Sequence, residues 1–188
     1  MGRDPVNDAW IGDPPDEAYG RVTDPGRYAP LHAAAHELLA ELERRFNVTR
    51  ETFNEPDQHG VGPAVGVRLI PADASAGRLA IVFDAFPGLI VRMGSGDWMH
   101  EPVCGCDACA ETVEECTGRL RVQLDALVAG SFGERLVLAA GWWHESWYLD
   151  ERGEMATGRS LVDGSRLAEL QAAMPEGELA YSAWPARG

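Results

Sequence analysis

Three of the four cysteines in this chain fall within six residues. They are Cys104, Cys106 and Cys109 in the stretch CGCDAC, and Cys116 follows seven residues later. Zinc in proteins prefers four tetrahedral ligands, and thiolates are among them. A helix that begins at the cluster would stabilise thiolates through its free N–H groups and its dipole. The spacing therefore predicts a metal site in which zinc binds the three sulfurs.

The fourth ligand must come from outside the cluster. We expect it to be His100, because the segment HEPVC that joins it to Cys104 can extend. His144 is a second candidate, and a water or an Asp side chain in its place would leave an open, catalytic position. Cys116 cannot reach the same ion if it shares a helix with Cys109, since seven residues span about 10.5 Å. We expect Cys116 to be a buried, unreactive core residue.

Two other interpretations of the cysteines stay open. Cys106 and Cys109 form a C-x-x-C pair, which is typical of thiol redox proteins, although the strand and βαβ setting of such motifs are missing. The thiols could also be reduced structural groups without a metal. The sequence favours a non-catalytic metal site over an enzyme, but it does not decide whether the chain has an activity.

A second group of chemically interesting residues is the aromatic stretch GWWHESWY. Alternation along a strand places Trp143 and Trp147 on one face and Trp142 and Tyr148 on the other. One of these faces must belong to the core. The tryptophans and His144 are therefore candidates for a ligand-binding surface.

The pattern of hydrophobic residues predicts an α+β fold. Alternating runs separated by short turns indicate an antiparallel sheet of about five to six strands, packed against two main helices. Strands are expected at 64–70, 78–86, 88–93, 135–149 (with a bulge at Gly141) and 155–160, and the tail 178–184 can add an edge strand. Helices are expected at 31–46, 108–129 and 164–173, with a loop at 50–64.

The second of these helices would position the cysteines. We expect Asp107 to be its N-cap and Gly130 to lie just past its end. Residues 1–30, which are rich in Pro, Gly and Asp, are expected to form an irregular arm packed on a single domain of residues 31–188.

Charge and composition exclude several classes of function. The 188 residues carry a net charge of −14, which argues against binding to nucleic acids or anionic membranes and favours a basic protein partner, so an acidic interaction module is a further hypothesis. All 16 basic residues are Arg, which excludes Schiff-base catalysis by Lys and a Walker phosphate loop. No apolar run could span a bilayer and no signal peptide is recognisable, so we expect a cytoplasmic protein with reduced thiols.

The stretch CGCDACAET, together with the later strand GWWHESWY, resembles an uncharacterised domain-of-unknown-function family of high-GC actinobacteria that carries a CGCDAC signature. The resemblance spans most of the chain and implies no activity. It marks Cys104, Cys106, Asp107 and Cys109 as positions shared with that family. Ala110 stands where an acidic residue is expected, so the resemblance supports no role for a carboxylate there.

Overall fold

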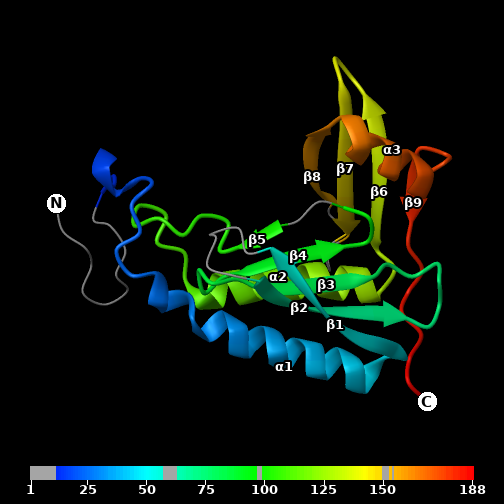
Figure 1. Cartoon of the computed structure of the whole chain (residues 1–188), viewed down its shortest axis with the longest axis horizontal. Helices are drawn as coiled ribbons and strands as arrows, with labels where there is room; N and C mark the ends of the chain where they lie inside the picture. Colours follow the sequence, from blue (N-terminus) through cyan, green and yellow to red (C-terminus); the bar gives the residue numbers. More distant parts are fainter. Residues whose placement is uncertain (1–11, 57–62, 97–98, 150–152, 154) are drawn as a thin grey trace.

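Two antiparallel sheets and three α-helices form the protein in the computed structural model, which describes residues 12–56, 63–96, 99–149, 153 and 155–188 (Figure 1). The α+β class is confirmed, but the prediction of one sheet is wrong. The strands divide into a sheet of five and a sheet of four, because the chain leaves the first sheet through α2 and then begins a new one.

The first sheet has the strand order β1-β2-β3-β4-β5, so neighbours in space are also neighbours in sequence. The predicted antiparallel meander of its central strands is confirmed. The strands are β1 (Val48–Pro56), β2 (Pro63–Pro71), β3 (Leu79–Phe83), β4 (Leu89–Met93) and β5 (Met99–Glu101).

β1 lies where the sequence predicts a loop at 50–64. Its stretch VTRETFNEP carries several charged and polar side chains, which weakens the strand pattern but suits the exposed edge of a sheet. The ring of Phe53 packs over Gly66 of β2, where a Cβ would come within 2.3 Å of it. The prediction is wrong because pairing with β2, rather than burial, makes this segment a strand. Residues 57–62 of the expected loop lie outside the described residues.

α1 (Pro30–Arg45) and α2 (Val113–Val128) cover one face of the first sheet and contact each other (Figure 1). Leucines spaced three or four residues apart on both helices pack against alternate residues of β2, β3 and β4. The main members of this core are Leu31, Leu38, Leu39, Leu42, Leu120, Leu124 and Leu127 from the helices, and Val67, Leu69, Leu79, Ile81, Leu89 and Val91 from the strands.

α2 begins later than the sequence predicts. The expected helix 108–129 has Asp107 as its N-cap, whereas the structure begins α2 at Val113 with Thr112 as N-cap. Thr112 Oγ1 accepts a hydrogen bond from the backbone N–H of Glu115, and the Glu115 carboxylate accepts one from the backbone N–H of Thr112. This reciprocal capping box satisfies two N–H groups and fixes the start of the helix. The cysteine cluster therefore lies in the loop before α2 and not on the helix.

The second sheet has the order β8-β7-β6-β9 and carries α3 (Gly164–Ala173) on one face, where Leu170 packs on Trp142 and Val162. The predicted helix 164–173 and the edge strand in the tail are confirmed. The strands are β6 (Phe132–Leu138), β7 (Trp142–Leu149), β8 (Met155–Val162) and β9 (Glu178–Ala180).

The single strand expected at 135–149 is in fact most of a hairpin formed by β6 and β7. Gly141 lies in the turn and not in a bulge, and its φ of 147° is one that glycine adopts without cost. Its carbonyl accepts a hydrogen bond from the backbone N–H of Ala139 at 2.8 Å. Ala139 and Ala140 are apolar residues and not the polar ones that usually mark a turn, so the sequence predicts a strand that runs on through them.

The described part of the N-terminal arm, residues 12–29, contains two single turns of 3-10 helix, η1 (Asp16–Ala18) and η2 (Pro25–Tyr28). Tyr28 is buried in the main core, and Ala18 is buried in a small cluster with Cys106 and Ala108. The arm therefore contributes to the surroundings of the cysteines. Residues 1–11 lie outside the described residues.

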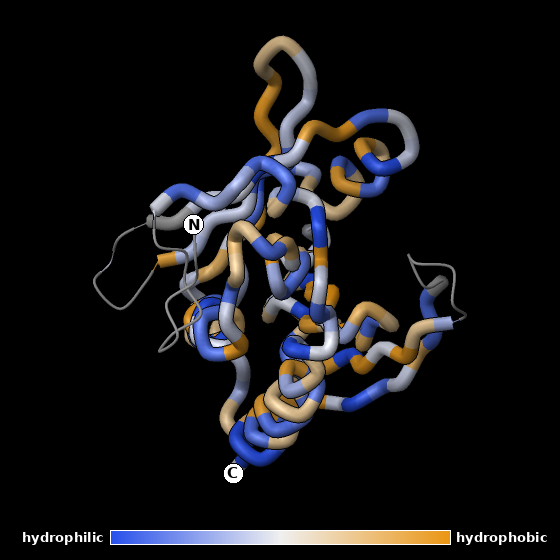
Figure 2. The backbone as a smooth tube through the Cα atoms, turned by 90° about the vertical axis from the view of Figure 1, so that its left-hand side faces the viewer, coloured by the Kyte–Doolittle hydropathy of each residue, from blue (hydrophilic) through white to orange (hydrophobic). Residues whose placement is uncertain are grey.

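None of the helices in the described ranges is long and apolar enough to cross a membrane. Figure 2 shows hydrophilic and hydrophobic residues mixed along the backbone of the helices rather than gathered into one long apolar segment.

Candidate metal centre

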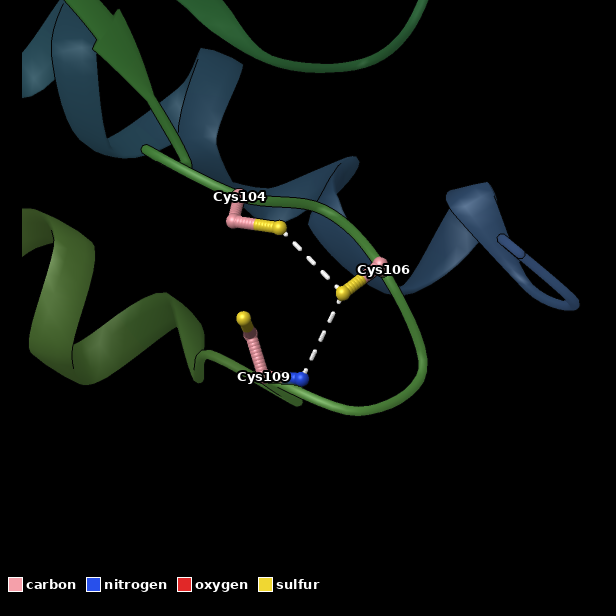
Figure 3. Close-up of side chains that lie close together, drawn as sticks. All are labelled: Cys104, Cys106 and Cys109. Atoms are coloured by element: carbon pink, nitrogen blue, oxygen red, sulfur yellow. Dashed lines mark hydrogen bonds between the residues drawn. The ribbon is translucent and has the colours of Figure 1, made fainter. Parts of the chain in front are cut away.

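The sulfur atoms of Cys104, Cys106 and Cys109 all lie within 4.8 Å of one another. The Sγ atoms of Cys104 and Cys106 are 3.2 Å apart, and the backbone N–H of Cys109 donates to Cys106 Sγ at 3.5 Å. Figure 3 shows the loop curving so that the side chain of Cys109 points back toward the other two sulfurs. The sequence expectation that the three sulfurs converge is met, by a turn in the loop and not by a helix start.

The N-terminal arm holds this loop from one side. The carboxylate of Asp107 accepts hydrogen bonds from the backbone N–H of Thr23 at 2.9 Å, from Thr23 Oγ1 at 2.6 Å and from Arg21 Nε at 2.9 Å. Arg27 donates to the carbonyl oxygens of Gly105 and Cys106, both at 3.1 Å. The hydrogen bonds that Thr23 and Arg21 donate to the Asp107 carboxylate keep its pKa well below the usual range, and those from Thr23 contribute most. Asp107 is thus a tether to the arm and not the helix N-cap.

The loop is also tied to α2, through Glu111, a residue that the sequence pattern did not single out and that lies just before the helix. The Glu111 carboxylate accepts a hydrogen bond from the backbone N–H of Cys104 at 2.6 Å. Arg119 of α2 donates to both Glu111 and the buried Glu101 of β5. The capping-box pattern T-x-x-E at 112–115 could have indicated this from the sequence, because it starts the helix at Val113 and so leaves Glu111 in the loop.

The thiols of Cys106 and Cys109 have pKa values shifted in opposite directions. The pKa of Cys106 is lowered to about 6, chiefly because the backbone N–H of Cys109 donates to its sulfur, with further help from the thiol of Cys104 and the backbone N–H of Gly20. The pKa of Cys109 is raised to about 12, because its thiol is hydrogen-bonded to the sulfurs of Cys104 and Cys106. The hydrogen bonds within the cluster therefore favour a negative charge on Cys106 over one on Cys109.

Cys116 does not belong to this cluster. It is fully buried in the main core, as predicted from its place on the apolar face of α2. The helical spacing that separated it from Cys109 does not apply, because Cys109 precedes α2. Burial is the main cause that raises the pKa of the Cys116 thiol to about 12, and the negative charge of Glu101 is the second cause. Its sulfur lies within 4.8 Å of carboxylate oxygens of Glu101 and Glu111, but Arg119 already occupies the space between those two carboxylates as their counter-ion.

Neither predicted histidine joins the three sulfurs. His100 is an exposed residue of β5, where it pairs with Ile90 of β4. His144 is buried in β7 of the second sheet, and its Nε2 lies 3.1 Å from Oε1 of Glu134. Within the part of the chain that the structure describes, the group of ligand atoms at this site consists of the three cysteine sulfurs.

The aromatic residues of β7 do not gather on one surface. Trp142 packs in the hydrophobic cluster under α3, and the ring of Trp147 lies against Gly133 of β6. Trp143 receives the guanidinium of Arg159 over its ring, 4.5 Å from the centroid. His144 lines a cavity of about 200 Å³ together with Met93 and Met99 of the first sheet and Ser160 of the second.

A buried polar cluster surrounds His144. Glu134 is fully buried and accepts hydrogen bonds from the hydroxyl of Tyr181 and, at 2.9 Å, from the backbone N–H of Ser95. Burial and the nearby Glu134 carboxylate raise the pKa of Tyr181, so its hydroxyl remains the donor. The cluster joins β6, β7, the C-terminal tail and the segment after β4, an assembly that sequence spacing could not reveal.

A family model matches almost the whole chain, residues 5–188, under the description "Family of unknown function (DUF6226)". Comparisons with curated proteins and with solved structures give no match. The match includes the cysteine loop and both sheets, and it confirms the expected membership in a family of unknown function. The chain belongs to DUF6226.

Proposed function

We propose that this chain binds a single zinc ion through Cys104, Cys106 and Cys109, and that the ion has a structural, non-catalytic role. The observation that carries the proposal is the approach of the three sulfurs to within 4.8 Å in a loop held by both the arm and α2. Thiolates are soft ligands, which favour zinc over magnesium or calcium. The ion would cross-link the segment that follows β5 to the segment that leads into α2, within a loop that the arm already holds by hydrogen bonds.

The geometry requires only a small adjustment. With Zn–S bonds of 2.3 Å, two sulfurs on a tetrahedral ion are about 3.8 Å apart. The 3.2 Å between Cys104 and Cys106 would therefore widen slightly on binding. Cys109 is exposed, which leaves the fourth position accessible to a water molecule. His100 could take that position only if β5 moved away from its pairing with β4.

Thiol chemistry is a second candidate function, because the two sulfurs 3.2 Å apart would form a disulfide if they approached by a further ~1.2 Å. The reacting pair would be Cys104 and Cys106 rather than the C-x-x-C pair. Oxidation would join the two sulfurs and transfer their two protons and two electrons to the disulfide of a partner molecule, whose S–S bond breaks to give two thiols. This candidate requires the site to be free of metal.

The test is the metal content of the untagged chain, purified under reducing conditions without chelator. We expect about one zinc per chain, because the three sulfurs can serve a single ion. Cys106→Ser and Cys109→Ser should each lose most of it, while Cys116→Ser, a control that alters a thiol outside the cluster, should keep it. A chelator should lower the melting temperature of the wild type but not that of Cys106→Ser.

The proposal fails if the wild type carries no stoichiometric metal, takes up no added zinc and melts identically with and without chelator. The thiol candidate then predicts that oxidised glutathione removes two free thiols, reversibly, from the wild type and none from Cys104→Ser.

A further inference from the structure

A cavity of about 640 Å³ lies between the first sheet and α3, far from the cysteine loop in sequence. Its volume falls within the range of small-molecule sites, about 300–1,000 Å³. One wall is a single face of α3, formed by Arg166, Glu169, Leu170 and Ala173, which are spaced by three or four residues. Figure 1 shows α3 and β9 standing beside the end of the first sheet at which β2 leads into β3.

The floor of the cavity is a row of cross-strand partners on the face of the first sheet opposite α1 and α2. Arg68 of β2 pairs with Ala80 of β3, and Ala80 pairs with Arg92 of β4. Directly paired residues of antiparallel strands project to the same face. The two arginines therefore rise on either side of a small residue, about 10 Å apart at the backbone.

Two further arginines complete the cavity. Arg166 of α3 donates to the carbonyl oxygens of Ser95 and Gly96, and Arg92 donates to the same Ser95 carbonyl at 3.2 Å. The guanidinium groups of Arg92 and Arg166 are thus held together at one acceptor. Arg78, two residues before Ala80, also lines the cavity, and within the described ranges it forms no ion pair.

This cavity concentrates positive charge in an acidic protein. Its lining contains four of the 16 arginines, with Glu55 and Glu169 as its acidic members, a formal surplus of two positive charges. The whole chain has a net charge of −14, but the acidic residues outside the cavity are screened beyond roughly 8 Å at physiological ionic strength. Among the described residues, the one of them that pairs with a cavity arginine at short range is Glu51, 3.6 Å from Arg68. The electrostatic potential that acts on a ligand inside the cavity is therefore set mainly by the nearby arginines.

We infer that this cavity binds a small molecule that carries a phosphate group. Arginine presents a planar fork of donors that matches phosphate oxygens in pairs. A phosphate monoester carries a charge of about −1.5 to −2 at pH 7, which matches the surplus of the lining. The remaining volume accommodates the organic part of the ligand against Leu170 and Leu179. This site is independent of the metal centre.

The experiment measures binding of inorganic pyrophosphate to the full chain by isothermal titration calorimetry, with citrate as a probe for carboxylates. Arg78→Gln and Arg68→Gln remove charge from the cavity without touching the buried core. The matched control is Arg121→Gln, an exposed arginine of α2 that pairs with Glu41 at 3.4 Å. Far-ultraviolet circular dichroism and the melting temperature verify that each variant is folded.

We expect one saturable pyrophosphate site, weakened at least about tenfold by each cavity variant and unchanged in the control. Absence of saturable binding, or an equal loss in Arg121→Gln, would overturn the inference. Citrate binding as tight as that of pyrophosphate would overturn the assignment to phosphate.

Discussion

The cysteine loop and the arginine cavity gather chemical groups in opposite ways. The loop takes its three sulfurs from six consecutive residues, whereas the cavity takes its arginines from positions 68 to 166, across β2, β4, α3 and the turn before β3. Short spacing limits how far apart side chains can lie, so the sulfurs converge with little help from the rest of the fold. The arginines meet only because the strands pair in one register and the second sheet places α3 over the first.

The two regions also depend on different supports. The cysteine loop is held by hydrogen bonds that Asp107 accepts from Thr23 of the arm and that Glu111 accepts from the backbone N–H of Cys104. The cavity rests on the segment after β4, whose Ser95 is held by the buried Glu134. Substitutions that remove one support at a time can therefore separate the locally formed site from the assembled one.

Glu134→Ala should have the largest effect. It would leave the Tyr181 hydroxyl, the backbone N–H of Ser95 and His144 without their shared acceptor in a buried place. We expect a loss of about 3–5 kcal/mol in the free energy of unfolding, measured by urea denaturation. Pyrophosphate binding should weaken as well, while metal content at the cysteine loop should not change in the folded fraction.

The control for this substitution is Glu145→Ala. Glu145 pairs with Arg135 at 2.8 Å, and that arginine is largely exposed. A partly exposed pair of this kind contributes about 0–1 kcal/mol. If the two variants were equally stable, the buried cluster would not be the support that we assign to it.

Asp107→Ala should have an intermediate effect on stability. It removes three hydrogen bonds to a carboxylate that tie the cysteine loop to Thr23 and Arg21. We expect a loss of about 2 kcal/mol in the free energy of unfolding and a weaker hold on zinc in competition with a chelator. Pyrophosphate binding should stay as in the wild type, which would show that the two regions are independent.

Asp73→Ala is the matched control, because the Asp73 carboxylate also accepts from a backbone N–H and a hydroxyl, both of Ser75 only two residues away. Its bonds are local and exposed, so the loss in the free energy of unfolding should be smaller than that in Asp107→Ala. Unchanged zinc affinity in Asp107→Ala would refute the tether to the arm.

Thr112→Ala should have the smallest effect. Because it removes the N-cap of α2, it should lower the free energy of unfolding by about 1 kcal/mol. Thr117→Ala, in the interior of the same helix, should cost nothing or stabilise slightly, because alanine is the better helix former. Urea denaturation of the pair tests where the helix begins. Equal effects would mean that the helix does not begin at Val113, and that Cys109 could lie on it after all.

Local patterns in the sequence determined several features correctly. The meander of β2, β3 and β4, the helices α1 and α3, and the burial of Cys116 follow from hydrophobic periodicity over a few residues. The closeness of the three cysteines follows from their spacing alone. These features depend on short stretches of chain, in which each residue constrains its neighbours directly.

Other features were decided only by the tertiary structure. Pairing with β2 made a strand of the charged segment at β1, and a turn of two alanines and a glycine divided residues 132–149 between two strands. The partners of Asp107, Glu134 and His144 lie up to 86 residues away from them in sequence. The arginine cavity exists because register and sheet packing bring separate strands and a helix together. Such contacts depend on the free energy of the whole assembled chain, which no short stretch of sequence encodes.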